Sequence, residues 1–240
     1  MIRGDRHDRL DALRGFAMVW MALFHFVFDL NFYGLVDPRQ DFYRDPLWTT
    51  QRTLIVSLFL LAAGAGQAVA VERGQPWPRF WKRWAQVAGC AVLVSAGSYV
   101  MFPRSWISFG VLHGIALMLL VLRATAPLGR AWFLIGLVAL VLPHVVQHPF
   151  FDTRWTNWVG LVTRKPVTED FVPLLPWIGV MGIGYATARE LLRARPGVLA
   201  GRLPRALQPL AALGRWPLTF YMLHQPVLIG GILAWLALSR

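Results

Sequence analysis

The sequence predicts an all-α protein that crosses a membrane about seven times. Of its 240 residues, 56% are hydrophobic and only 15% are charged, whereas about a quarter of a soluble domain is charged. The apolar residues also form long continuous stretches, while the strands of a membrane barrel would be short and alternating. Only helices and closed barrels satisfy their own backbone hydrogen bonds in lipid, so these stretches indicate helices. The composition argues against a soluble enzyme or a disordered chain.

Seven stretches are nearly free of charged residues, and most approach the roughly 20 residues that a helix needs to cross the bilayer. The stretch at 131–146 is the shortest, which leaves the count between six and eight. The first stretch contains Asp11 and Arg14 and lacks a small-residue cleavage site, so we expect a retained anchor. We expect one integral-membrane domain over 1–240, with spans at 10–30, 53–71, 84–102, 106–122, 131–146, 171–188 and 216–239.

The distribution of basic residues predicts the orientation of the chain. With the N-terminus inside, 15 of the 24 Lys and Arg residues fall on the inner side, 8 fall outside and 1 lies within a span. The positive-inside rule therefore places the N-terminus in the cytoplasm. The net charge of +12 needs no nucleic-acid partner, because no basic folded domain lies outside the predicted spans. The inner bases are Arg3, Arg6, Arg9, Arg73, Arg79, Lys82, Arg83, Arg123, Arg130, Arg189, Arg193, Arg195, Arg202, Arg205 and Arg215, and Arg240 is among the outer ones.

The first predicted span carries four ionisable residues, which are costly at membrane depth and usually mark function. At 100° per residue, Asp11, Arg14, His25 and Asp29 fall within an arc of about 60° on one helix face. Asp11 and Arg14 have the spacing of a structural ion pair near the inner surface. His25 and Asp29 have the spacing of a general base and a carboxylate that orients it. Helix docking alone is the alternative for both pairs.

Three further polar positions lie in or beside the apolar stretches. His113 lies between two glycines that permit close helix approach, and it is either catalytic or a satisfied core histidine. His224 and Gln225 precede Pro226, which frees a backbone carbonyl and should kink the last span. Asp170 lies where the sixth span begins, at the expected outer surface, where it either caps a helix or contacts a substrate.

Three basic residues, Arg79, Lys82 and Arg83, lie at the inner end of the third span, interleaved with tryptophans. They serve either as a topology signal or as a site for the phosphates of a nucleotide cofactor, with an indole stacked on its base. The only cysteine is Cys90, which excludes an intrachain disulfide and a cysteine-cluster metal site. We therefore expect no metal.

Several ordered blocks of the chain resemble the heparan-α-glucosaminide N-acetyltransferase catalytic-domain family. The opening helix matches at residues 9–17 and 21–30, and residues 109–117 resemble the family's Gly-x-Leu-His motif. Residues 170–177 and 214–228 resemble two later blocks. The chain is shorter than the lysosomal member, and we expect it to lack that enzyme's luminal domain. It also lacks the extended loop after the first helix that holds an active-site histidine, which leaves the acceptor open.

The resemblance implies a membrane acyltransferase that takes an acyl group, expected to be acetyl, from cytoplasmic acyl-CoA. The acceptor would be a carbohydrate-type hydroxyl or amine reached from the other side of a bacterial inner membrane. On this reading His25, oriented by Asp29, is the general base, or forms an acetyl-histidine intermediate. We expect His113, His224 or Gln225 to donate a hydrogen bond to the developing oxyanion. The phosphates of CoA would bind Arg14, Arg79, Lys82 and Arg83. Asp170 and Trp177 would contact the substrate.

Two other classes of membrane protein use the same residue types. A proton-coupled transporter would use the histidine and aspartate groups as a relay, although no internal repeat is evident. A redox protein would use the histidines in pairs as haem ligands. Membrane lipids are expected partners in every case, and assembly into an oligomer of identical chains stays open.

Overall fold

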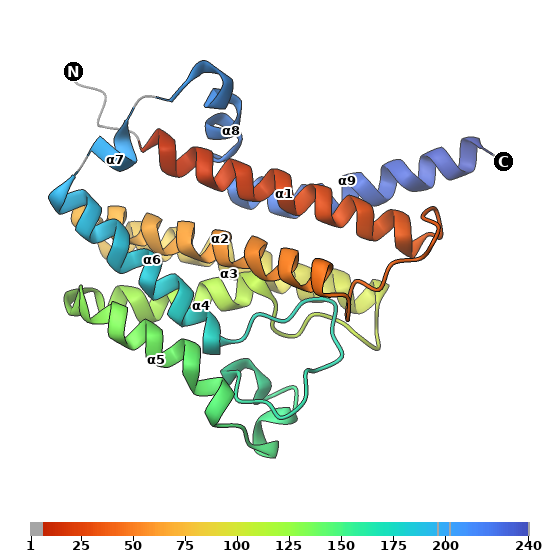
Figure 1. Ribbon diagram of the computed structural model, residues 1–240, viewed down its shortest axis with the longest axis horizontal. Helices are drawn as coiled ribbons and strands as arrows, with labels where there is room; N and C mark the ends of the chain where they lie inside the picture. Colours follow the sequence, from red (N-terminus) through yellow and green to blue (C-terminus); the bar gives the residue numbers. More distant parts are fainter. Residues whose placement is uncertain (1–6, 196, 202, 240) are drawn as a thin grey trace. The chain divides into compact units, whose positions relative to one another are not determined.

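The computed structural model describes residues 7–195, 197–201 and 203–239, and all the regular secondary structure in that part of the chain is helical (Figure 1). The predicted all-α class is therefore confirmed. The chain divides into two compact units, Met1–Phe59 with Ala200–Arg240, and Leu60–Leu199. Four of the bases used to predict the orientation, Arg3, Arg6, Arg202 and Arg240, lie outside the described residues.

The first unit is built around helix α1 (Asp8–Phe32). It also contains the first part of α2 (Pro46–Glu72), the short elements η4 (Arg205–Leu207) and α8 (Gln208–Leu213), and α9 (Pro217–Leu238). Its core is largely aromatic, with Phe24 and Phe42 buried beside Met21 and Ile55. Near its start, α1 approaches α8 so closely that a side chain on Gly15 would overlap the backbone of Leu210. This contact fixes α8 against α1.

The turn between α1 and α2 is determined by local backbone chemistry. Gly34 has φ 74°, and its N–H donates to the carbonyl of Asn31 while the N–H of Leu35 donates to that of Leu30. This Schellman arrangement ends α1 and favours glycine. The carboxylate of Asp45 accepts from the N–H of Leu47 at 2.8 Å, so Asp45 caps the start of α2. Helix α2 therefore begins about two turns before the predicted span at 53–71.

The second unit contains the rest of α2 and the helices α3 (Trp77–Met101), α4 (Val111–Ala124), α5 (Ala131–Val145) and α6 (Leu174–Ala194). Short elements η1 (Ala126–Leu128), η2 (Pro149–Asp152) and η3 (Asn157–Val159) lie in its connections, and α7 (Gly197–Ala200) follows it. Helices α5 and α6 lie side by side, as Figure 1 shows, because Gly136 and Gly179 let their backbones meet. Gly184 on α6 packs against the backbone of Leu61 on α2 in the same way.

Each predicted span corresponds to one helix, but the lengths and boundaries differ. Helices α1, α2, α3 and α9 are long and apolar enough to cross a membrane, whereas α4 and α5 have 14 and 15 residues. Helix α4 starts at Val111 instead of residue 106, because the preceding residues pair with a later loop. In that pairing the N–H of Val172 donates to Phe109 and that of Glu169 donates to Ser105. Helix α6 runs past the predicted end at 188 to Ala194.

Candidate active site

A polar cluster in the first unit joins α1 to α9. His25 and Asp29 lie one turn apart on α1, and His224 and Gln225 are adjacent on α9. His25 Nδ1 lies 3.1 Å from His224 Nε2. Gln225 Nε2 lies 2.8 and 3.0 Å from the two carboxylate oxygens of Asp29. Residues 196 to 199 positions apart in the chain therefore partner one another in two adjacent pairs.

The contacts of His224 fix the tautomers of the histidine pair. His224 Nδ1 lies 2.7 Å from the carbonyl oxygen of Tyr221, which can only accept, so this nitrogen carries a proton. In the neutral ring His224 Nε2 then has a lone pair and must accept from His25 Nδ1–H. His25 Nε2 is consequently left without a proton. The chain of hydrogen bonds thus directs a basic lone pair away from His224.

The ring that orients His25 is therefore His224 and not Asp29, which corrects the role expected from the spacing of His25 and Asp29. Spacing one turn apart permits a contact between two side chains, but a better partner on α9 takes each of them. Aromatic neighbours restrict both imidazoles further. Phe220 lies parallel to His224 at a centroid distance of 5.9 Å, and Phe24 lies edge-on to His25 at 5.8 Å.

Asp29 and Gln225 form the second half of the cluster. Asp29 is 3% exposed, and both of its carboxylate oxygens accept from the side-chain amide nitrogen of Gln225. Gln225 Oε1 is buried and has no hydrogen-bond partner in the part of the chain that the structure describes. In this structure His224 Nδ1–H donates to Tyr221 and the Gln225 amide nitrogen donates to Asp29, so the predicted oxyanion contact of either residue stays a prediction. What Gln225 offers is an acceptor oxygen.

At the other end of α1, Arg14 Nη1 lies 2.9 Å from Asp11 Oδ1, as the spacing of a structural pair predicts. This pair lies beside α8, where Gly214 packs on the backbone of Asp11. Phosphate binding by Arg14 would require it to share its guanidinium with Asp11. The four ionisable residues of α1 thus fall into two groups. Asp11 and Arg14 pair with each other near the start of the helix, and His25 and Asp29, nearer its end, have partners on α9.

His113, in the second unit, uses both ring nitrogens. Its Nδ1 accepts from the backbone N–H of Gly110 at 3.3 Å, in a capping box at the start of α4. Its Nε2 lies 3.2 Å from Ser95 Oγ, whose hydroxyl donates to the carbonyl of Ile107 at 2.6 Å. The acceptor at Nδ1 places the ring proton on Nε2, which donates to Ser95. His113 therefore joins α3 to α4 and has no free lone pair.

Asp170 lies at the same helix start. Its Oδ2 accepts from the N–H of Val111 at 2.7 Å, and a side chain on Gly110 would overlap this carboxylate. Asp170 thus caps the start of α4. It was expected to lie at the start of the sixth span, which corresponds to α6. Trp177 is half-buried on α6, in the same unit. Substrate contact by these two residues stays a prediction.

The basic group at the start of α3 is exposed. Arg79, Lys82 and Arg83 all lie at the surface of the second unit, and Arg83 Nη1 is 3.3 Å from Gln86 Oε1. The neighbouring indoles differ in their roles. Trp84 donates its N–H to the carbonyl of Ala116 at 2.9 Å, whereas Trp77 and Trp81 are 48% and 47% exposed.

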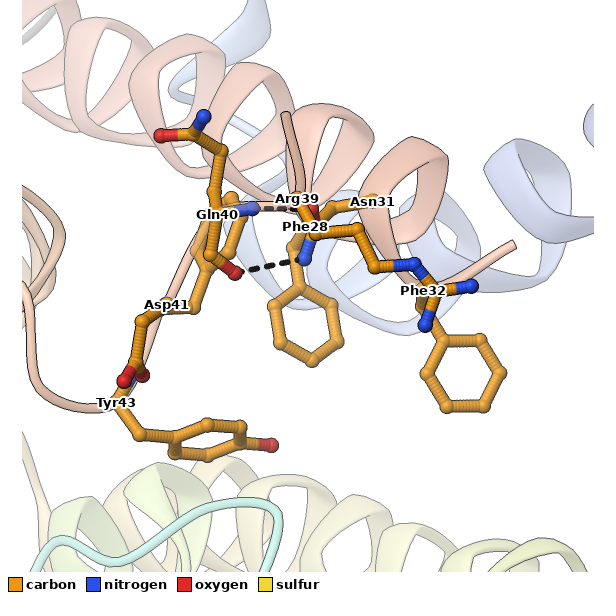
Figure 2. Close-up of a pocket in the computed structure, with 8 residues that line it drawn as sticks. Phe28, Asn31, Phe32, Arg39, Gln40, Asp41 and Tyr43 are labelled. Carbon is orange, nitrogen blue, oxygen red and sulfur yellow. Dashed lines mark hydrogen bonds between the residues drawn. The ribbon is translucent and has the colours of Figure 1, made fainter. Parts of the chain in front are cut away.

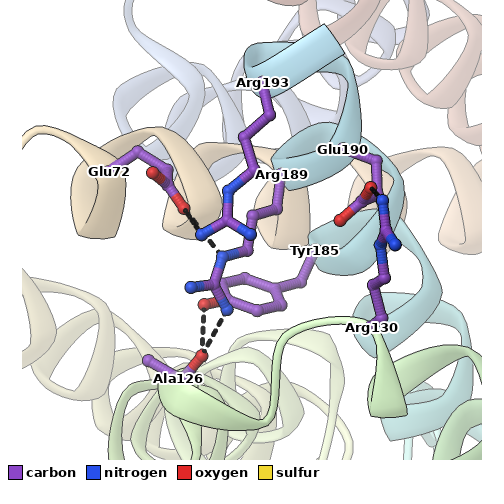
Figure 3. A network of polar contacts seen from close by, with 7 residues as sticks. All are labelled: Glu72, Ala126, Arg130, Tyr185, Arg189, Glu190 and Arg193. Carbon is purple, nitrogen blue, oxygen red and sulfur yellow. Dashed lines mark hydrogen bonds and ion pairs between the residues drawn. The ribbon is translucent and has the colours of Figure 1, made fainter.

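A network of charged residues that sequence reasoning did not find joins α2 and α6 in the second unit (Figure 3). Glu72 lies 2.7 Å from Arg189 and 3.4 Å from Arg193. Arg189 and Tyr185 both donate to the carbonyl of Ala126, at 2.9 and 3.0 Å. Glu190 pairs with Arg130, and its carboxylate raises the pKa of that exposed guanidinium. The sequence does contain opposite charges at the ends of different spans, which indicates that ion pairs can form there. It does not show which of these charges pair.

No group of three or more His, Cys, Asp or Glu residues with the arrangement of a metal site occurs among the described residues. Residues 6–226 match the family model described as "Heparan-alpha-glucosaminide N-acetyltransferase, catalytic". No curated protein and no solved structure matches the chain.

Proposed function

Since the chain belongs to the heparan-alpha-glucosaminide N-acetyltransferase catalytic family, whose activity is that of a membrane acetyltransferase, we propose that His25 is its general base. The observation that carries the proposal is the hydrogen-bond chain from the Tyr221 carbonyl through His224 to His25, which leaves His25 Nε2 unprotonated. A base must have its lone pair free and its ring held in place, and this arrangement supplies both.

In the proposed reaction, His25 Nε2 removes a proton from the acceptor hydroxyl or amine while the acceptor atom attacks the carbonyl carbon of the thioester. The bond from the acceptor to carbon forms, the carbon–sulfur bond breaks, and the CoA thiolate leaves. His25 returns its proton to that sulfur, so the base is regenerated. Gln225 Oε1, which is buried and unpartnered within the described residues, accepts a hydrogen bond from the acceptor and orients it.

The acyl donor in this proposal is acetyl-CoA bound from the cytoplasmic side of a bacterial inner membrane. The exposed cations Arg79, Lys82 and Arg83 would hold its phosphates, because each lies at the surface of α3 beside exposed indole rings. Trp77 and Trp81 are the indoles with accessible faces, and their ring centroids are 6.1 Å apart. Arg14 has a smaller role here, because Asp11 already engages it.

Transfer by the purified protein in liposomes tests this proposal. We expect the His25→Ala variant to lose acetyl transfer to acceptor while it retains acetyl-CoA binding, measured separately by equilibrium dialysis. His144→Gln, a histidine substitution at the end of α5, serves as the matched control and should transfer normally. Unchanged transfer by His25→Ala would overturn the assignment. A single-turnover quench also separates direct transfer, which leaves no label on the protein, from a labelled acetyl-histidine intermediate.

A further inference from the structure

A cavity of about 480 Å³ lies in the first unit, where the loop after α1 folds back on the end of that helix (Figure 2). Its volume is within the range of sites for small organic ligands. Phe28 and Phe32 of α1 and Tyr43 of the loop supply its aromatic walls. Phe32 and Tyr43 are 59% and 55% exposed, so their ring faces are accessible to a ligand.

The loop that forms the cavity is held rigidly. Asn31 donates to the carbonyl of Gln40 at 3.0 Å and accepts from its N–H at 2.7 Å. The Gln40 side chain donates to the carbonyl of Pro38 and accepts from Trp48. Asp41 Oδ1 accepts from the backbone N–H groups of Tyr43 and Arg44, both at 3.0 Å. The site is therefore formed in advance, which lowers the entropy cost of binding.

One charged group in this cavity and one oxygen of another have no partner in the part of the chain that the structure describes. The Arg39 guanidinium makes no hydrogen bond or ion pair within the described chain, and Asp41 Oδ2 makes none either. Figure 2 shows the Arg39 side chain extending toward Phe32. A free guanidinium beside aromatic rings binds carboxylate or phosphate groups, and a free carboxylate oxygen accepts from hydroxyls.

The position of the cavity relates it to His25. Phe28 and Phe32 follow His25 by three and seven residues, so they lie on the same face of α1. Along the helix axis they are about 4.5 and 10.5 Å from His25, at about 1.5 Å per residue. The cavity therefore includes residues from the face of α1 that carries the proposed base.

We propose that this cavity binds the acceptor as a polyhydroxylated ring that carries a carboxylate or phosphate, with Arg39 selecting the anion and Phe32 and Tyr43 contacting the ring. The inference rests on the proposed function for its link to transfer, but binding at the cavity can be measured without any transfer. The anionic group comes either from a soluble sugar acid or phosphate or from a lipid headgroup.

Isothermal titration of the full-length protein in phosphatidylcholine nanodiscs tests the proposal, with methyl β-D-glucuronide and methyl β-D-glucoside as probes. We expect the glucuronide to bind at least tenfold more tightly than the glucoside. Arg39→Gln should weaken glucuronide binding about 10- to 100-fold, the range of a charge-assisted hydrogen bond, and leave the glucoside unchanged. Phe32→Ala should weaken both probes about threefold to tenfold by removing ring contact.

Arg44→Gln is the matched control, because it removes the same charge from the same loop but Arg44 does not line the cavity. Equal effects of Arg44→Gln and Arg39→Gln, or no effect of Arg39→Gln, would overturn the proposal, as would equal binding of the two probes.

Nanodiscs of phosphatidylglycerol separate the two anion sources. If the cavity binds a lipid headgroup, phosphatidylglycerol should compete with the glucuronide and weaken its binding to the wild-type protein, but not to Arg39→Gln. If the cavity binds a soluble acceptor, glucuronide binding should be the same in both kinds of nanodisc. If His25→Ala loses transfer but the wild-type protein does not bind the glucuronide, the proposal for the cavity is refuted while His25 as the general base still stands.

Discussion

His25 and His113 have similar surroundings in the sequence, but the hydrogen-bond partners of their ring nitrogens differ. Each lies in an apolar helix, and each has another polar side chain on a neighbouring helix. His113 accepts at Nδ1 from Gly110 and donates from Nε2 to Ser95, so its ring is fully used in joining α3 to α4. His25 donates from Nδ1 to His224 and keeps the lone pair of Nε2. The partners of an imidazole, more than its depth in a helix, decide whether it can remove a proton.

The same contrast holds for the two carboxylates. Asp170 accepts from the N–H of Val111 and stabilises the start of α4. Asp29 accepts from a side-chain amide whose own oxygen is left without a partner in the described residues. Saturated polar groups fix a structure, whereas an incomplete network with a free acceptor is suited to a ligand. Under the proposed function, this difference places the chemistry on α1 and α9 and leaves a scaffolding role to α4.

The largest expected effect separates the two histidines directly. His25→Gln should lower the rate of acetyl transfer by about 10²–10⁴-fold, the contribution of a general base, without unfolding the protein. His113→Gln, measured per folded molecule, should lower it less than threefold. Radiolabelled acetyl-CoA and a thermal melt of each variant provide the two readouts. Equal losses of activity in the two variants would remove the distinction between the sites.

Substitution of His224 sharpens the account of how His25 is oriented. His224→Leu removes the acceptor for His25 Nδ1–H and should lower kcat about 10- to 100-fold, with KM for acetyl-CoA unchanged. His224→Gln offers an amide oxygen at the same place and should recover most of that loss. A purely structural role for His224 predicts instead that activity follows the melting temperature in both variants.

The scaffolding role of the second cluster predicts a loss of stability. His113→Ala and Asp170→Ala each remove an interaction at the start of α4 and should each destabilise the protein by about 1–2 kcal/mol. The two losses should not add, because both residues serve the same helix end. Denaturant titration in detergent, with the double variant included, measures this coupling. Full additivity would show that the two residues act on separate parts of the fold.

The smallest effect concerns the connection between α5 and α6. Thr163 donates its hydroxyl and backbone N–H to Asp152, at 2.5 and 2.7 Å, and these bonds lower the pKa of the exposed carboxyl. Because the folded pKa lies below the unfolded one, this contribution is present above the unfolded pKa of about 3.9 and is lost as the pH falls through the folded pKa. Hydrogen exchange of residues 147–170 should therefore show less protection near pH 3 than near pH 6, corrected for intrinsic rates. Thr163→Val should reduce this pH dependence, and an unchanged dependence would contradict the assignment to Asp152.

Much of the fold follows from the sequence, because long apolar stretches are the strongest local signal of membrane helices. Each predicted stretch corresponds to one helix, and the errors lie in the lengths and the ends. Helix α2 begins early because of the Asp45 cap, and α4 begins late because residues 105 and 109 pair with a distant loop. Caps and loop pairings depend on single hydrogen bonds, which hydrophobicity does not report.

The residues of the candidate site could be selected from the sequence, but their pairing could not. Ionisable side chains within an apolar helix identify His25 and Asp29, and a polar pair before a proline identifies His224 and Gln225. Which of these meet depends on how α9 packs against α1, and that contact joins residues about 200 positions apart. The cavity beside Arg39 could not be predicted for a related reason. The shape of the loop that forms it depends on contacts such as those of Asn31 with Gln40, which the sequence does not show.

Hydrogen-bond partners leave a basic nitrogen on His25 and none on His113. Nitrogen-15 spectra of histidine-labelled protein test it most directly, because protonated and unprotonated ring nitrogens differ widely in chemical shift. Single His→Gln variants provide the assignments. We expect His25 and His224 to carry their proton on Nδ1 and His113 to carry it on Nε2. A proton on Nε2 of His25 at the pH of transfer would contradict the account.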